Sequence, residues 1–243
     1  NLTTVAILSS VTEIKKCAFS ECKNLTEITI PSSVKSIGDN AFYECKKIKE
    51  IFLPSSVTNI GESAFEKCES LTKFIIPSSV TSIEKFTFSG CISLEEITIP
   101  SSITSIGHSA FFDCAKLEEL EIPSSVKSIG DGILAQCCSL KKIAFTSSLK
   151  KIGKLLFYSC SSLTEIIIPP IVKNIVENAF VNCTSLTTIE IPPSVEFIGK
   201  SAFKYCSSLK KITIPPLVKV IENETFYQCT SLIEVNMPSS LEL

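Results

Sequence analysis

Apolar residues recur along this chain with one constant period. Isoleucine returns every 23 residues from Ile14 to Ile221, and a cysteine follows each isoleucine after eight residues, from Cys22 to Cys229. Phenylalanine lies three residues before nine of these ten cysteines, and Leu134 is the exception. A fixed period of this length is typical of solenoids, in which each repeat buries its apolar side chains only against its neighbours. The sequence therefore predicts ten stacked coils.

The start of each repeat predicts a β-strand. Residues 25–31 and 94–100 show the form L-x-x-I-x-I-P. The two isoleucines share one face of an extended segment, and the residue between them takes the opposite face. Proline then ends the strand because it lacks a backbone N–H group for pairing. Stacked repeats would therefore form a parallel β-sheet along one face of the solenoid, with a glycine that permits a corner after the next apolar pair.

A short helical turn is expected before each cysteine. The sequence Ala-Phe-x-x-Cys follows residue types that commonly cap helix N-termini, at Asn40, Ser63, Ser109, Asn178 and Ser201. One turn of helix would place phenylalanine and cysteine, three residues apart, on the same inner side. Each coil is thus expected to contain a strand, a corner, a short extended piece and a helical turn.

The complete repeat resembles one subclass of leucine-rich repeat. Its form, L-x-x-I-x-I-P-x-S-V-x-x-I-G-x-x-A-F-x-x-C, is similar to that of the BspA-like proteins found on the surfaces of bacteria and protozoa. The resemblance covers all ten repeats and implies one right-handed solenoid domain over residues 1–243. It also implies protein recognition, such as adhesion to host matrix or cell-surface proteins. Neither end shows a polar capping repeat, so we expect either that the chain is part of a longer protein or that its ends associate.

Charge and hydropathy argue against two kinds of partner. The net charge is −2, and both signs are spread along the chain, so no basic surface for nucleic acid is predicted. Mean hydropathy is +0.34, but no apolar stretch approaches the roughly 18 to 20 residues that span a bilayer. Direct membrane insertion is therefore not expected, and nothing in the sequence determines an oligomeric state.

The cellular compartment is left open by two opposing signals. Four N-glycosylation motifs favour a secreted or cell-surface protein, at Asn1, Asn24, Asn182 and Asn223. Twelve cysteines favour a reducing cytosol if they are free thiols.

The cysteines do not predict a metal site or a catalytic centre. Metal ligands commonly lie two to five residues apart, whereas the repeat cysteines lie 23 apart. We expect them to form a buried apolar column, with disulfide bridges between adjacent coils as the alternative. Cys17 and Cys138, which lie outside the pattern, are expected to be exposed. His108 is the only histidine, and it occupies a variable polar corner without a predicted catalytic partner. The sequence thus predicts no enzyme, no cofactor and no metal.

One deviating repeat suggests an alternative partner. Residues 142–145, Lys-Ile-Ala-Phe, resemble the docking motif with which regulators engage type 1 protein phosphatase. Ile143 and Phe145 fall on the two inward strand positions, however, and such motifs need an accessible extended peptide. An intracellular scaffold, or a regulatory subunit of an enzyme such as a phosphatase, remains the alternative function.

Outward residues of the predicted sheet are the candidate partner-binding site. They combine an apolar pair, a group of five glutamates and several lysines: Lys49, Glu50, Phe52, Lys73, Ile75, Glu95, Glu96, Glu118, Glu119, Glu121, Lys141 and Lys142. Exposed apolar residues within a polar rim are typical of binding hot spots, and adjacent glutamates favour a basic partner or cation. An ordinary solvated surface is the alternative interpretation. A rival patch contains Tyr43, Phe112, Tyr158 and Tyr227.

Overall fold

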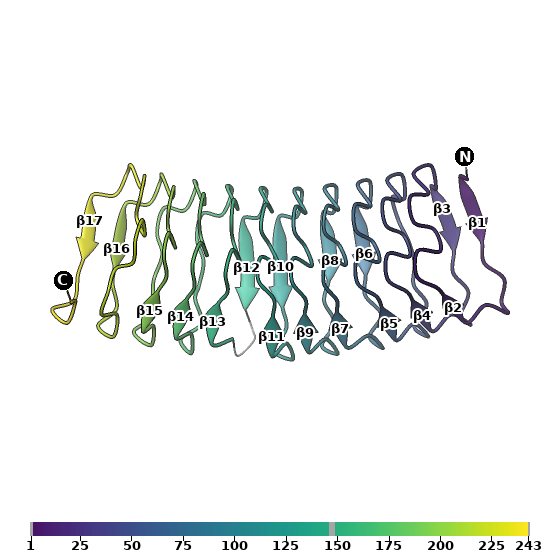
Figure 1. Ribbon diagram of the computed structural model, residues 1–243, viewed down its shortest axis with the longest axis horizontal. Coiled ribbons are helices and arrows are strands. Elements are labelled where there is room, and N and C mark those ends of the chain that lie inside the picture. The colour runs from purple at the N-terminus through teal and green to yellow at the C-terminus, as the bar shows by residue number, and fades with distance from the viewer. Residues whose placement is uncertain (1, 146–148, 243) are drawn as a thin grey trace.

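The chain folds as an elongated parallel β-solenoid. The computed structural model describes residues 2–145 and 149–242. Coils follow one another along the long axis, so that the two termini lie at opposite ends of the rod (Figure 1). Secondary structure in the described residues consists of β-strands and turns without a helix. The predicted stacked repeat architecture is thus confirmed.

One long face of the rod carries the strands predicted from the I-x-I pattern, and we call it the strand-lined face. Its strands pair in parallel with a register step of 23 residues, as Glu119 with Lys142 shows. They are β1 (Thr4–Ala6), β3 (Glu27–Thr29), β6 (Lys73–Ile75), β8 (Glu96–Thr98), β10 (Glu119–Ile122), β12 (Lys142–Phe145), β16 (Lys211–Thr213) and β17 (Glu234–Asn236). Residues 50–52 lie on this face without forming a strand, and Ile167 and Glu190 form only an isolated bridge.

A second run of short strands lies on another side of each coil. Every one ends in the invariant isoleucine of the repeat, and Ile14, Ile37 and Ile60 pair in succession. The strands are β2 (Glu13–Ile14), β4 (Ser36–Ile37), β5 (Asn59–Ile60), β7 (Ser82–Ile83), β9 (Ser105–Ile106), β11 (Ser128–Ile129), β13 (Lys151–Ile152), β14 (Asn174–Ile175) and β15 (Phe197–Ile198). Identical positions in consecutive coils are therefore direct neighbours in space.

The core between these sides is built from columns of identical residues. Consecutive phenylalanine rings stack with centroids 5.2 to 5.8 Å apart. Leu134 interrupts the column, and in the following repeat Phe145 replaces an aliphatic residue and packs edge-on against Phe157. Phe74 likewise inserts its ring beside Phe65 and Phe88. Burial of these rings is a large source of apolar stabilisation in each coil.

The predicted helical turn is wrong. The residues expected to cap a helix adopt left-handed backbone conformations instead, with φ 54° at Asn40 and 55° at Ser63. The reason lies in the hydrogen bonds: the N–H groups of Asn40, Phe42 and Glu44 donate to carbonyl oxygens of the following coil. Bonding between coils thus replaces bonding within a helix. Asparagine tolerates the left-handed region better than most non-glycine residues.

Glycine at the corner serves close packing of coils rather than a left-handed turn. A Cβ atom at Gly130 would lie 2.4 Å from the backbone nitrogen of His108, and one at Gly38 would lie 2.5 Å from that of Lys16. Neither glycine has a positive φ. A side chain there would force the backbones of adjacent coils apart.

Candidate functional site

All twelve candidate residues are exposed and lie on the strand-lined face or directly before one of its strands. They come from five consecutive coils, which extend from residues 49–52 through β6, β8 and β10 to β12. The buried residues that alternate with them anchor this surface, since Phe74 and Leu120 are only 2% and 3% exposed.

Phe52 and Ile75 form an exposed apolar pair on neighbouring coils. They are 71% and 69% exposed, respectively. Together they line a hollow of about 220 Å³, whose polar rim includes Glu50, Lys73 and Glu96. Exposure of two large apolar side chains is costly in water, so this pair is the part of the face best suited to burial by a partner.

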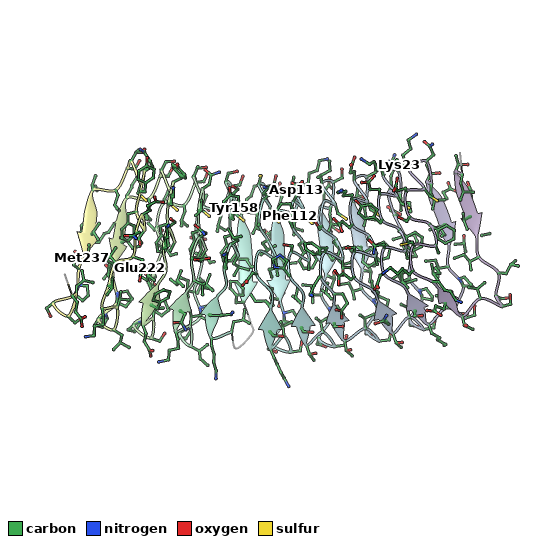
Figure 2. The ribbon with its side chains drawn as sticks, viewed as in Figure 1. Lys23, Phe112, Asp113, Tyr158, Glu222 and Met237 are labelled. Atoms are coloured by element: carbon green, nitrogen blue, oxygen red, sulfur yellow. The ribbon has the colours of Figure 1, made fainter. Side chains whose placement is uncertain are left out.

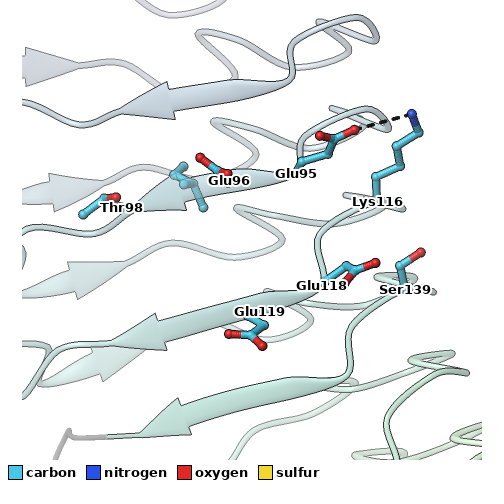
Figure 3. Close-up of a pocket in the computed structure, with 8 residues that line it drawn as sticks. Glu95, Glu96, Thr98, Lys116, Glu118, Glu119 and Ser139 are labelled. Carbon is cyan, nitrogen blue, oxygen red and sulfur yellow. Dashed lines mark ion pairs between the residues drawn. The ribbon is translucent and has the colours of Figure 1, made fainter.

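The five glutamates on β8 and β10 and just before them form an acidic band, defined as Glu95, Glu96, Glu118, Glu119 and Glu121. A shallow hollow of about 760 Å³ opens beside four of them. Lysines from neighbouring coils neutralise part of the band. Lys116 forms an ion pair with Glu95 (Figure 3), at 3.7 Å. Lys73 lies 2.9 Å from Glu96, and Lys141 lies 2.9 Å from Glu118.

Glu119 and Glu121 carry the remaining negative charge of the band. Across the described residues neither forms an ion pair. Both side chains point outward from β10 and are exposed. Glu121 is opposite Ala144 in the β10–β12 pairing, so a small side chain leaves its carboxylate accessible.

A further exposed apolar residue was not among the predicted candidates. Ile167 is 84% exposed and lines a hollow of about 450 Å³ with Glu165, Thr188 and Glu190. Its position in the repeat is the same as that of Phe52 and Ile75. Comparison of residues one period apart would therefore have found it.

The segment that resembles a phosphatase docking motif is part of the folded sheet. Residues 142–145 are β12, which pairs with β10 along its whole length. Ile143 is only 6% exposed, and the ring of Phe145 packs against Phe157. The segment is therefore not an accessible linear peptide.

The rival aromatic patch is less exposed than the strand-lined face. Tyr43, Phe112 and Tyr158 are half-buried, and Phe112 and Tyr158 lie along the turn-bearing edge of the rod (Figure 2). Tyr227 is 48% exposed, but the ammonium group of Lys204 lies 4.9 Å from the centre of its ring. This lysine already occupies the aromatic face that a cationic partner would use.

The repeat cysteines form a buried column of free thiols. From Cys45 to Cys229, each S–H group donates to a backbone carbonyl 26 residues earlier, at 3.1 to 3.4 Å. Burial raises the pKa of the Cys45 thiol to about 12 and raises that of Cys114 as well. Such thiols are unreactive because the thiolate is the nucleophilic form. Cys17 and Cys138 are exposed, as predicted.

In the described part of the chain, His108 and the possible metal ligands are not brought together into one site. His108 is exposed and contacts the edge of the Phe86 ring. No cluster of three or more histidine, cysteine or acidic side chains suited to a metal occurs in residues 2–145 and 149–242. Over the same residues, no helix could cross a membrane. Of the glycosylation motifs, Asn223 is exposed, Asn24 and Asn182 are half-buried, and Asn1 lies outside the described residues.

Comparisons with known proteins agree with this architecture. The family model for the BspA-type leucine-rich repeat region matches residues 1–103, 60–187 and 150–243. A leucine-rich repeat protein from Bacteroides ovatus is 31% identical, with a TM-score of 0.73 over 99% of this chain and 74% of its own. A leucine-rich cell surface protein from Faecalibacterium prausnitzii is 30% identical, with a TM-score of 0.70 over 97% and 79%. No curated protein shows significant similarity.

These matches extend over the whole chain and agree with the stacked coils. Leucine-rich repeat proteins typically act as modules that bind other proteins along extended surfaces. The chain belongs to the BspA-type leucine-rich repeat family.

Proposed function

We propose that this chain is a cell-surface or secreted recognition protein that binds a protein partner through its strand-lined face. The observation that carries the proposal is the exposed pair Phe52 and Ile75, which lies in a hollow with a charged rim. Large exposed apolar side chains within a polar rim are typical of the energetic centre of an interface. A similar cell surface protein in Faecalibacterium prausnitzii supports the proposed location.

Binding should depend on the apolar pair and not on apolar exposure in general. We expect replacement of both Phe52→Ser and Ile75→Ser to weaken binding at least about tenfold, because burial of two such side chains contributes on the order of 2 to 4 kcal/mol. The measurement is equilibrium binding to purified extracellular-matrix proteins and to washed host cells. Neither substitution removes a buried group, so thermal stability should change little.

Ile233→Ser is the matched control, since Ile233 is 87% exposed on the strand-lined face but lies far from the pair. The Ile233→Ser variant should bind with the affinity of the unmodified chain. Binding at this hollow would be contradicted if the double variant and Ile233→Ser lost affinity equally, or if neither lost affinity.

An intracellular scaffold or regulatory subunit, of a phosphatase for example, is the second candidate. It is favoured by twelve free cysteines, which are common in reducing compartments. Intact mass of the chain from its native source, with and without thiol alkylation under denaturing conditions, separates the two candidates. Under our first proposal we expect added glycan mass or blocked thiols. An unmodified chain that alkylates at every cysteine would contradict it and support the intracellular candidate.

A further inference from the structure

One column of outward residues runs along the middle of the strand-lined face, with one residue in each coil. We call it the centre column, and its relevant members, 23 residues apart, are Phe52, Ile75, Thr98, Glu121, Ala144 and Ile167. The column crosses β6, β8, β10 and β12, which follow one another along the rod axis (Figure 1). The centre column therefore runs parallel to that axis.

The pattern is apolar on both sides of a central acid. Ile75 lies two coils before Glu121, and Ile167 lies two coils after it. The two isoleucines are 69% and 84% exposed and line separate hollows. Only the small residues Thr98 and Ala144 lie between them and the glutamate, so the column is free of bulky obstruction.

Charge indicates what chemistry the middle of this surface would accept. Glu121 is exposed and, within the described residues, has no lysine paired with it, in contrast to Glu96 and Glu118. Glu119 on the same strand forms no ion pair there either, but it lies opposite Lys142. A partner with a basic side chain at this point would complement the Glu121 carboxylate, which lies opposite Ala144.

Spacing indicates the shape of the partner. Neighbouring strands lie about 4.8 Å apart, so each isoleucine is about 10 Å from Glu121 along the axis. Two turns of α-helix, or seven residues, rise about 11 Å and return to nearly the same helix face. An extended strand covers this distance in about three residues, and the third residue points to the opposite side.

We propose that the strand-lined face binds an amphipathic α-helix of another protein, which lies along the rod axis. A basic residue of this helix contacts Glu121, and the apolar residues seven positions before and after that basic residue contact Ile75 and Ile167. This inference deepens and rests on the proposed function. Phe52, one coil beyond Ile75, would receive a third apolar residue three or four positions further along the helix. A second copy of this chain does not fit, because its described residues contain no helix.

The test uses a synthetic amphipathic helix as the probe. It carries one arginine, leucines seven residues before and after it, and a further leucine four residues beyond the first, on a background of alanine, glutamine and lysine. A permuted peptide of the same composition, in which the leucines are three residues from the arginine, is the control. Fluorescence anisotropy should give micromolar binding for the first peptide and at least about tenfold weaker binding for the permuted one.

Variants of the full chain test each contact. Ile167→Thr should weaken binding about tenfold, and Glu121→Gln should weaken it about threefold and reduce its salt dependence. Their matched controls are Ile233→Thr, at the far end of this face, and Glu13→Gln, on the second run of strands, which change an exposed residue of the same type away from the centre column. Equal affinity for the two peptides, or equal effects of variants and controls, would overturn the inference.

A random peptide library displayed on phage and selected on the same chain separates this inference from the proposed function. Selected binders with the heptad-spaced pattern, lost on Ile167→Thr, support both. Binders that depend on Phe52 and Ile75 but lack helical spacing would overturn the helix and leave the proposed function standing. If no binder depends on the strand-lined face, both fail.

Discussion

Above about pH 9, the free energy of unfolding should fall steeply because the cysteine column must remain protonated in the folded chain. Six consecutive members from Cys68 to Cys183 are 0% exposed. Burial raises the pKa of each thiol above its ordinary range. The unfolded chain therefore releases these protons first as the pH rises. Stability is fully present below the ordinary thiol pKa of about 8.5 and is lost as the pH approaches the raised values.

The size of the effect follows from the number of thiols. Each proton released only on unfolding steepens the decline by about 1.4 kcal/mol per pH unit, so six thiols give a limiting slope of roughly 8 kcal/mol per pH unit. A typical domain stability of about 5 to 15 kcal/mol would then be lost within one to two pH units. Urea denaturation monitored by circular dichroism from pH 7 to 10.5, under reducing conditions, measures this slope.

Lysine and tyrosine also titrate near pH 10, so the test needs a variant that isolates the thiols. A chain with Cys91→Ala, Cys114→Ala and Cys137→Ala should show a limiting slope shallower by roughly 4 kcal/mol per pH unit. Its stability at pH 7 will be lower because three buried side chains become smaller. An unchanged slope would show that the column does not cause the alkaline loss.

Replacement of a phenylalanine in the middle of the stack should be the most damaging single core change. Phe88 is 0% exposed, and its ring centroid lies 5.7 Å from those of Phe65 and Phe111 and 4.7 Å from that of Phe74. We expect Phe88→Ala to lower the free energy of unfolding by about 3 to 5 kcal/mol, through lost burial and the cavity left between coils. Urea denaturation at pH 7 measures the change.

Phe226→Ala is the matched control at the end of the rod. Phe226 is half-buried, and among the described residues its one aromatic stacking partner is Phe203, with centroids 5.8 Å apart. Its replacement should cost less than half as much, because its ring already contacts solvent and the remaining coils keep their neighbours. Equal costs at the two positions would mean that stability does not depend on stacking from both sides.

The strand positions and inward columns could be predicted because a period of 23 residues fixes which residues become neighbours. Ile28 and Ile30, for example, alternate with outward Thr29 as the I-x-I pattern requires. The turn before each cysteine could not be predicted in this way. Asparagine and serine are suited both to a helix N-cap and to a left-handed turn, and only hydrogen bonding between coils selects the second at Asn40 and Ser63.

The same alternation predicts the candidate face, but it does not predict which charges on that face pair. The sequence groups the adjacent glutamates into one negative patch, whereas the structure pairs Glu96 with Lys73 and Glu118 with Lys141. In both pairs the partners are 23 residues apart. The same spacing also relates Glu119 to Lys142 and Glu50 to Lys73, which form no ion pair within the described residues, so the period alone does not predict which charges pair.

The stacking of coils along the rod axis also determines how this protein would respond to mechanical force. The backbone hydrogen bonds between coils, such as that from Gly130 N to Ile106 O, join successive coils, so tension applied at the two ends would open them one coil at a time. Each opened coil would release 23 residues, which extend to about 75 to 80 Å. A tether built in this way lengthens in equal steps and keeps the remaining coils folded. A connection formed by such a chain would dissipate mechanical work in successive unfolding steps and would not fail at the first one.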